Sequence, residues 1–208
     1  MMVSKLGDSL KFSSRTKIAL WLALVAIGVC GRLWQPAYNV TPFAAIGLAA
    51  GSLFGISISA AAVPIVALVL SNMALPGYGS TVMALVVYAS FLFPVLFGSL
   101  VQRQGWVAVL GGSLASSLIF FTTTNFATWA LSDLYPHTLS GLVTCYVAAL
   151  PFYRWMPIGD ALWSVSLFST LVAVGHVQQL VQPIQVIPVT TSDQQTVDRL
   201  TDEQRDRQ

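Results

Sequence analysis

The sequence predicts an all-α membrane protein, a bundle of about six transmembrane helices plus one short re-entrant or interfacial helix. The first reason is composition: 55% of the 208 residues are hydrophobic and only 9% are charged, whereas soluble domains average roughly 25% charged residues. The second reason is distribution, because residues 34–191 contain only four charged side chains, Arg103, Asp133, Arg154 and Asp160. So few charges cannot cover a water-facing surface, which excludes a soluble globular domain.

The distribution of charge divides the chain into three segments. They are a basic, cytoplasmic N-terminal segment (1–17), a transmembrane helical domain (18–178) and a polar tail that we expect to be disordered (179–208). The basic flank and the apolar run Ile18–Val29 also fit a signal peptide. However, a bulky valine precedes Cys30, and no small-x-small cleavage site comes before Arg32. We therefore expect an uncleaved first helix.

Apolar runs that approach the roughly 20 residues needed to cross a bilayer define the predicted spans. These runs are Ile18–Trp34, Thr41–Gly55, Ile56–Leu75, Val82–Val101, Trp106–Leu131 and Ile158–Val177. Turn-forming sequences such as Pro76–Ser80 separate neighbouring spans. A further apolar run, Thr138–Phe152, has only about 15 residues, which fits a re-entrant or interfacial helix better than a crossing.

The positive-inside tendency predicts the orientation in a bacterial inner (plasma) membrane, with the basic N-terminus in the cytoplasm. Six crossings then return the C-terminus to the cytoplasm, place Arg103 inside, and place Arg32 and Arg154 on the outer side. The alternative has seven crossings, in which Thr138–Phe152 also spans the membrane and the tail exits. Charge does not decide between the two, because the tail carries a net negative charge.

Small residues recur at helical spacing in two of the predicted spans. Gly47, Gly51 and Gly55 repeat every four residues, and Ala19 and Ala23 have the same spacing in the first span. Such rows let helix backbones approach closely in a bilayer. For the glycines we expect packing inside the bundle. For Ala19 and Ala23 we predict docking of a membrane partner, because the first span lies at the edge of the sequence order.

The stretch Thr122–Asp160 contains three of the four charges in the apolar region and is the predicted centre of function. Within it, Asn125 and Trp129 share one helix face with Thr122, because three and four residues separate them. Hydrogen bonds between helices would also explain this face, and Trp129 would also suit an interfacial anchor. The predicted ligand-binding residues, which meet in an outer cavity on the six-span topology, are Asn39, Asn72, Thr122, Asn125, Trp129 and Tyr146.

Arg154 and Asp160 bracket the turn before the last span, and we predict that they form an ion pair or a gate. No metal site is predicted, because His137 and His176 are far apart and have no cysteine or carboxylate at ligand spacing. The sequence has no phosphate loop, no GxSxG and no HExxH, so we expect neither an enzyme nor an ATPase, and no cofactor. Neither terminus is basic enough to predict binding of nucleic acid.

Five short blocks carry a resemblance. They are Asn39-Val40-Thr41-Pro42, Thr124-Asn125-Phe126-Ala127-Thr128-Trp129, Tyr135-Pro136-His137-Thr138, Cys145-Tyr146 and Gly159-Asp160. In these blocks and their spacing, residues 18–178 resemble a family of small bacterial multi-pass membrane proteins of unassigned function, in which an acidic residue tends to stand where this chain has Asn72. More remotely, the chain is similar to the S components of energy-coupling-factor vitamin transporters. That similarity implies six helices, a vitamin site near the outer face, and docking of a coupling subunit on small residues of the first helix, which Ala19 and Ala23 match.

Two functions are therefore expected from the sequence. The first is an integral membrane protein that binds or transports a small vitamin-like solute and has no ATPase of its own. The alternative is a structural or interaction subunit of a larger membrane complex. The expected partners are the lipid bilayer, a small-molecule ligand, and a membrane coupling subunit or another membrane protein.

Overall fold

A computed structural model describes residues 13–35 and 39–181, with side chains placed as far as Gly175. Every regular element in these two ranges is an α-helix. The chain divides into two compact units, Met1–His176 and Val177–Gln208, and the description below concerns the first unit. The predicted cytoplasmic segment (1–17) and the predicted disordered tail (179–208) lie mostly outside the described residues.

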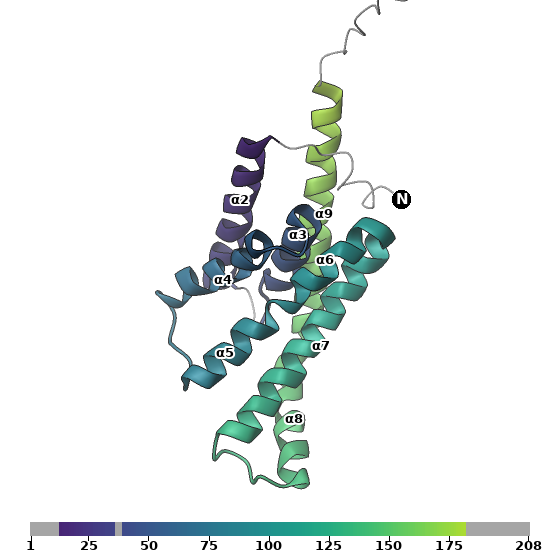
Figure 1. The fold of residues 1–208 in the computed structure, drawn as a ribbon. Helices are drawn as coiled ribbons and strands as arrows, with labels where there is room; N and C mark the ends of the chain where they lie inside the picture. The colour runs from purple at the N-terminus through teal and green to yellow at the C-terminus, as the bar shows by residue number, and fades with distance from the viewer. Residues whose placement is uncertain (1–12, 36–38, 182–208) are drawn as a thin grey trace, which may run out of the picture. The chain divides into compact units, whose positions relative to one another are not determined.

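The helices follow the predicted apolar runs closely (Figure 1). They are α2 (Ser14–Leu33), α3 (Phe43–Phe54), α4 (Ile58–Asn72), α5 (Thr81–Ser90), α6 (Phe93–Gln104), α7 (Trp106–Leu131), α8 (Leu139–Tyr153) and α9 (Met156–Val181). Four stretches are long and apolar enough to cross a membrane: α2, α5 with α6, α7, and Met156–Gly175 of α9. These stretches indicate a membrane protein. Because α3, α4 and α8 are shorter, the predicted six crossings are not confirmed.

Hydroxyl groups fix where several helices begin. Ser13, Ser57, Ser80 and Thr138 each accept a hydrogen bond from the backbone N–H three residues further along the chain. Each bond satisfies one of the N–H groups that the first helical turn leaves free, which contributes about 1 kcal/mol. These four polar residues therefore mark helix ends.

The predicted span Val82–Val101 is interrupted in the structure. Helix α5 ends at Ser90, and α6 begins at Phe93 with a proline in its first turn. Pro94 has no N–H, and its ring would clash with the carbonyl four residues earlier in a continuous helix. The interruption places Phe91 at the end of α5, where its ring packs 4.6 Å from the ring of Phe43, measured between centroids.

Helix α3 forms the core of the described bundle. All ten residues from Phe43 to Ser52 are buried, and the helix packs against α6, α4, α7 and α2 (Figure 1). A helix that is apolar on every face needs protein on every face. Its 12 residues are fewer than the roughly 20 of an ordinary crossing helix. In this structure α3 is therefore a core helix, and the other helices are arranged around it.

Two of the three glycines predicted to pack inside the bundle do so. A Cβ added at Gly98 on α6 would lie 2.5 Å from the Cα of Gly51, and a Cβ added at Gly47 would lie 2.8 Å from Pro94. Backbones this close leave no room for a side chain, so these glycines set the separation of α3 and α6. Gly55 follows the end of α3, and a Cβ there would have no neighbour within 4 Å.

Replacing Gly98 by alanine is expected to lower the free energy of unfolding by about 3 kcal/mol, the upper part of the usual range for an overpacked core. The added methyl group would meet the backbone of α3, which cannot rotate away as a side chain can. Unfolding by SDS in mixed micelles measures the change. The control is Gly111→Ala on α7, where a Cβ has no neighbour within 4 Å. Equal stabilities of the two variants would contradict the close α3–α6 contact.

Candidate functional site

Two adjoining cavities lie near the N-terminal end of α3. The larger, of about 400 Å³, is lined by parts of α2, α3, α5 and α7 and by the segments before α3 and after α4. The smaller, of about 250 Å³, lies between α7 and the junction of α8 and α9. Asn39, Phe120 and Met156 line both, and we call the pair the composite cavity. Its size suits a small molecule, since ligand pockets run from roughly 300 to 1,000 Å³.

Arg32 brings the one charged side chain among the described residues that line the composite cavity. It belongs to the last turn of α2, where a cation suits the helix dipole. Its Nη1 donates to Ser71 Oγ at 3.2 Å, and its Nη2 donates to the hydroxyl oxygen of Tyr78 at 3.0 Å. The guanidinium also lies over the ring of Phe43, 5.8 Å from the centroid. Neutral groups thus hold this half-buried cation in place.

Asn39 lies where the two cavities join. Its φ of 62° is the one positive value at a non-glycine residue in the described chain. Asparagine adopts this left-handed conformation more readily than most residues, and residues held in it often cluster at functional sites. The structure thus places this predicted site residue in the cavity lining, while its contact with a ligand stays a prediction.

Three phenylalanines form an aromatic wall on the larger cavity. The rings of Phe43 and Phe91 lie 4.6 Å apart, and those of Phe91 and Phe120 lie 4.7 Å apart, between centroids. The three residues come from α3, from the break between α5 and α6, and from α7. Tilted rings at such spacings stabilise one another. Phe91 and Phe120 are half-buried and offer a ligand apolar surface, whereas Phe43 is fully buried and supports the ring of Phe91.

Asn125, a predicted site residue on α7, lines the smaller cavity, and its contact with a ligand stays a prediction. Its Nδ2 donates to the carbonyl of Phe121 in its own helix at 2.7 Å. Within the described chain its Oδ1 accepts no hydrogen bond, so this oxygen is available to a donor on a ligand. Tyr153 of α8 lines the same cavity.

The other predicted residues of α7 and α8 join those two helices instead of lining the composite cavity. Trp129 donates from Nε1 to the carbonyl of Pro136 at 3.0 Å and packs edge-on against His137. Tyr146 donates to the backbone carbonyl of Thr122 at 2.7 Å. The side-chain hydroxyl of Thr122 bonds carbonyls of its own helix. These contacts fix α8 and its loop against α7.

Asn72 lies beside the cavity without lining it. Its Nδ2 donates to the hydroxyl oxygen of Tyr88 at 3.0 Å, whereas its Oδ1 is buried and has no hydrogen-bond partner. Tyr88 packs edge-on against Tyr78, which binds Arg32. Asn72 is therefore connected to the cavity through two tyrosines.

The predicted ion pair between Arg154 and Asp160 is not formed in the described structure. Arg154 is exposed at the end of α8, and its guanidinium lies over the ring of Trp155. Asp160 is only 2% exposed and accepts a hydrogen bond of 2.5 Å from Ser117 of α7. The two residues part because the chain changes from α8 to α9 between them. The break leaves the side chain of Arg154 exposed and that of Asp160 buried against Ser117 of α7.

Several residues of the site are not among the predicted ones, namely Arg32, Phe43, Phe91, Phe120 and Met156. Only Arg32 carries a signal that sequence reasoning can use, since an arginine at the end of an apolar helix often marks function. The phenylalanines carry none, because an apolar chain offers many equivalent aromatic residues. No group of three or more His, Cys, Asp and Glu side chains among the described residues is able to hold a metal ion.

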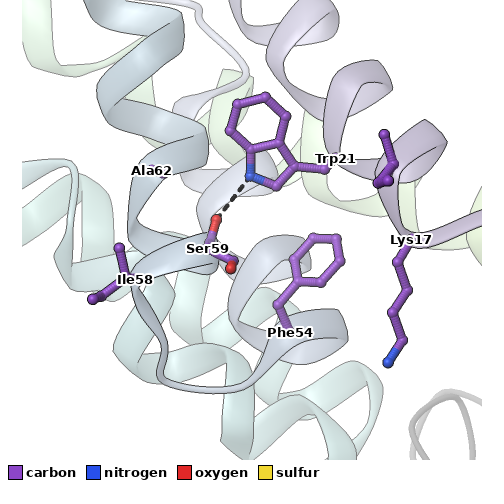
Figure 2. A pocket seen from close by; sticks show the side chains of 7 residues that line it. Lys17, Trp21, Phe54, Ile58, Ser59 and Ala62 are labelled. Carbon is purple, nitrogen blue, oxygen red and sulfur yellow. Dashed lines mark hydrogen bonds between the residues drawn. The ribbon is translucent and has the colours of Figure 1, made fainter. Parts of the chain in front are cut away.

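A third, mainly apolar pocket of about 520 Å³ lies between the N-terminal ends of α2 and α4. Figure 2 shows Trp21 donating to the carbonyl of Ser59 across it, at 2.8 Å, beside Phe54 and Ile58. On α2 itself, Ala19 and Ala23 are exposed. The predicted docking face is thus open in the described chain, and its partner stays a prediction.

The sequence matches, over residues 12–183, the family described as "Family of unknown function (DUF6580)". The chain belongs to this family. The matched part of this DUF6580 chain contains every helix described above, which confirms the predicted membership of a family without an assigned function. Comparison of the DUF6580 chain with curated proteins and with solved structures gave no match. The similarity to S components is therefore not shown.

Removing the Ser117 hydroxyl is expected to destabilise this DUF6580 protein by about 1–3 kcal/mol, because the buried carboxyl of Asp160 would lose its hydrogen bond. SDS-induced unfolding of Ser117→Ala measures the loss. Ser116→Ala is the matched control, since that buried hydroxyl bonds only the backbone of its own helix, where such a bond adds little stability. In an Asp160→Leu background, the Ser117→Ala loss should fall to the control value. If Ser117→Ala cost as much stability in the Asp160→Leu background as in the native protein, the loss would not come from the Ser117–Asp160 hydrogen bond.

Proposed function

We propose that this DUF6580 protein binds or transports a small vitamin-like solute in the composite cavity and has no ATPase of its own. The observation that carries the proposal is the joining of two cavities at Asn39, Phe120 and Met156. Pockets with an apolar lining and a few convergent polar groups are typical of small-molecule sites. Arg32 and Asn125 are such groups, one in each cavity, and the left-handed backbone of Asn39 adds support.

Small molecules that remain bound during purification in mild detergent test this proposal. Mass spectrometry of the native protein should find one defined solute. Asn125→Ala should reduce its occupancy by removing the free amide oxygen, and Ala149→Phe should abolish it by filling the smaller cavity, which Ala149 lines. Trp129→Phe is the control, because Trp129 contacts the α7–α8 loop and not the cavity. No solute, or equal occupancy in all three variants, would contradict the proposal.

We further propose the bacterial inner membrane as its location, with six crossings and both ends in the cytoplasm, because the N-terminal flank is basic. The test uses a chain without Cys30 and Cys145, in which single cysteines replace Ser4 or Ser192. Both positions lie outside the described residues. Both cysteines should resist an impermeant thiol reagent in intact cells. Labelling at position 192 alone would require an odd number of crossings.

One observation favours the alternative function, a subunit of a larger membrane complex. Ala19 and Ala23 are exposed on α2, so a partner helix would be able to approach closely there. A coupling subunit of a transporter would use the same face, so this surface is compatible with both functions. The purified native protein separates them, because a purely structural subunit would retain its partner and hold no solute.

A further inference from the structure

The guanidinium of Arg32 has no negative partner in the described structure. Asp133 and Asp160 are the acidic residues of ranges 13–35 and 39–181, and neither lies within 4.0 Å of a basic group. Asp160 is instead buried against Ser117. A cation at the end of an apolar helix normally pairs with an anion or marks a site. Arg32 has only two hydroxyl acceptors and one ring.

The unused donors of Arg32 belong to a side chain that is already fixed in position. A guanidinium has five N–H donors in a planar fork, and the hydroxyls of Ser71 and Tyr78 engage two of them. Because Arg32 lines the larger cavity, a ligand there is within reach of the remaining donors. Such a fork binds carboxylate or phosphate oxygens in pairs, and it does so more strongly than it binds neutral acceptors.

Away from Arg32, the lining of the larger cavity is mainly apolar. The aromatic wall of Phe43, Phe91 and Phe120 is continued by the apolar side chains of Leu75 and Val87. A flat apolar body would bury apolar surface against the half-buried rings of Phe91 and Phe120. A highly hydrated polar body would lose its water there without compensation.

We infer that the solute carries a carboxylate or phosphate group, which Arg32 binds, on a planar apolar body that packs against the aromatic wall. This inference rests on the proposed function and narrows the class of solute. The same anionic chemistry is present in a phospholipid headgroup, so the test below includes one. A neutral solute would leave the guanidinium unpaired, and a cationic solute would be repelled.

The test compares matched probes on the purified full-length protein in detergent. Benzoate and phenyl phosphate are the anionic probes, benzamide and benzyl alcohol are their neutral counterparts, and dihexanoyl phosphatidylglycerol represents a lipid headgroup. Thermal unfolding, followed by tryptophan fluorescence at constant ionic strength, gives the apparent Kd of each probe from the rise in Tm. At least one anionic probe should bind about tenfold more tightly than its neutral counterpart, as expected for a charge-assisted pair.

Two variants locate the effect at Arg32. Arg32→Gln retains a donor for Ser71 or Tyr78 but removes the charge, so it should abolish the preference for the anion. Arg32→Lys should retain part of it. Arg103→Gln is the control, because Arg103 is exposed at the end of α6 and outside the cavity. It should bind the probes as the native protein does.

Equal binding of anionic and neutral probes to the native protein would overturn the inference, even if Arg32→Gln does not fold. A preference that survives in Arg32→Gln, or disappears in Arg103→Gln, would also overturn it. Stabilisation by the short lipid alone would assign Arg32 to the bilayer. A neutral or cationic solute in the mass spectrum would support the proposed binding function and reject only the anionic class of solute. The absence of any solute would instead contradict the proposed function itself.

Discussion

The direct contact of backbones at Gly51 and Gly98 determines how near α3 and α6 lie to each other. With no side chain between them, the two helices fix the position of α3 inside the bundle, where every residue from Phe43 to Ser52 is buried. Phe43 is the first residue of that helix. Its ring lies beneath the guanidinium of Arg32 and beside the ring of Phe91. A residue of the buried core, Phe43, is therefore in direct contact with two residues that line the candidate site.

Sequence patterns predicted the helices well where the boundary signals are local. The run Trp106–Leu131 was predicted as one span and is α7 without change, because Gly105 and a polar segment delimit it. The break between α5 and α6 was not predicted, since a proline in an apolar run is compatible with a kinked or a divided helix. The number of crossings stays a prediction, because the lengths of α3, α4 and α8 do not determine their position in a bilayer.

The candidate site was predicted only in part, for a related reason. The position of Asn125 on a helix face is a local property, and the structure places it in the smaller cavity. The partner of Trp129 depends instead on the path of the α7–α8 loop, which brings the carbonyl of Pro136 to its indole. Arg154 and Asp160 are close in sequence, yet a change of helix separates their environments. Spacing predicts neighbours within a helix, but not across a break or a loop.

Phe91 occupies the interruption between α5 and α6, and this position has a mechanical consequence. One part of the aromatic wall, Phe43, belongs to a helix that glycine contacts hold on its α6 side. The neighbouring part belongs to a joint without continuous helical hydrogen bonding, where Phe91 and Leu92 separate two rigid rods. A rotation of α5 about this joint would move Val87 relative to Phe43 without disturbing the glycine contact, but it would break the hydrogen bond between Ser90 and Thr123 that ties α5 to α7. The larger cavity therefore has one wall held by the backbone contact of Gly51 and Gly98, and another wall whose position depends on the angle between α5 and α6.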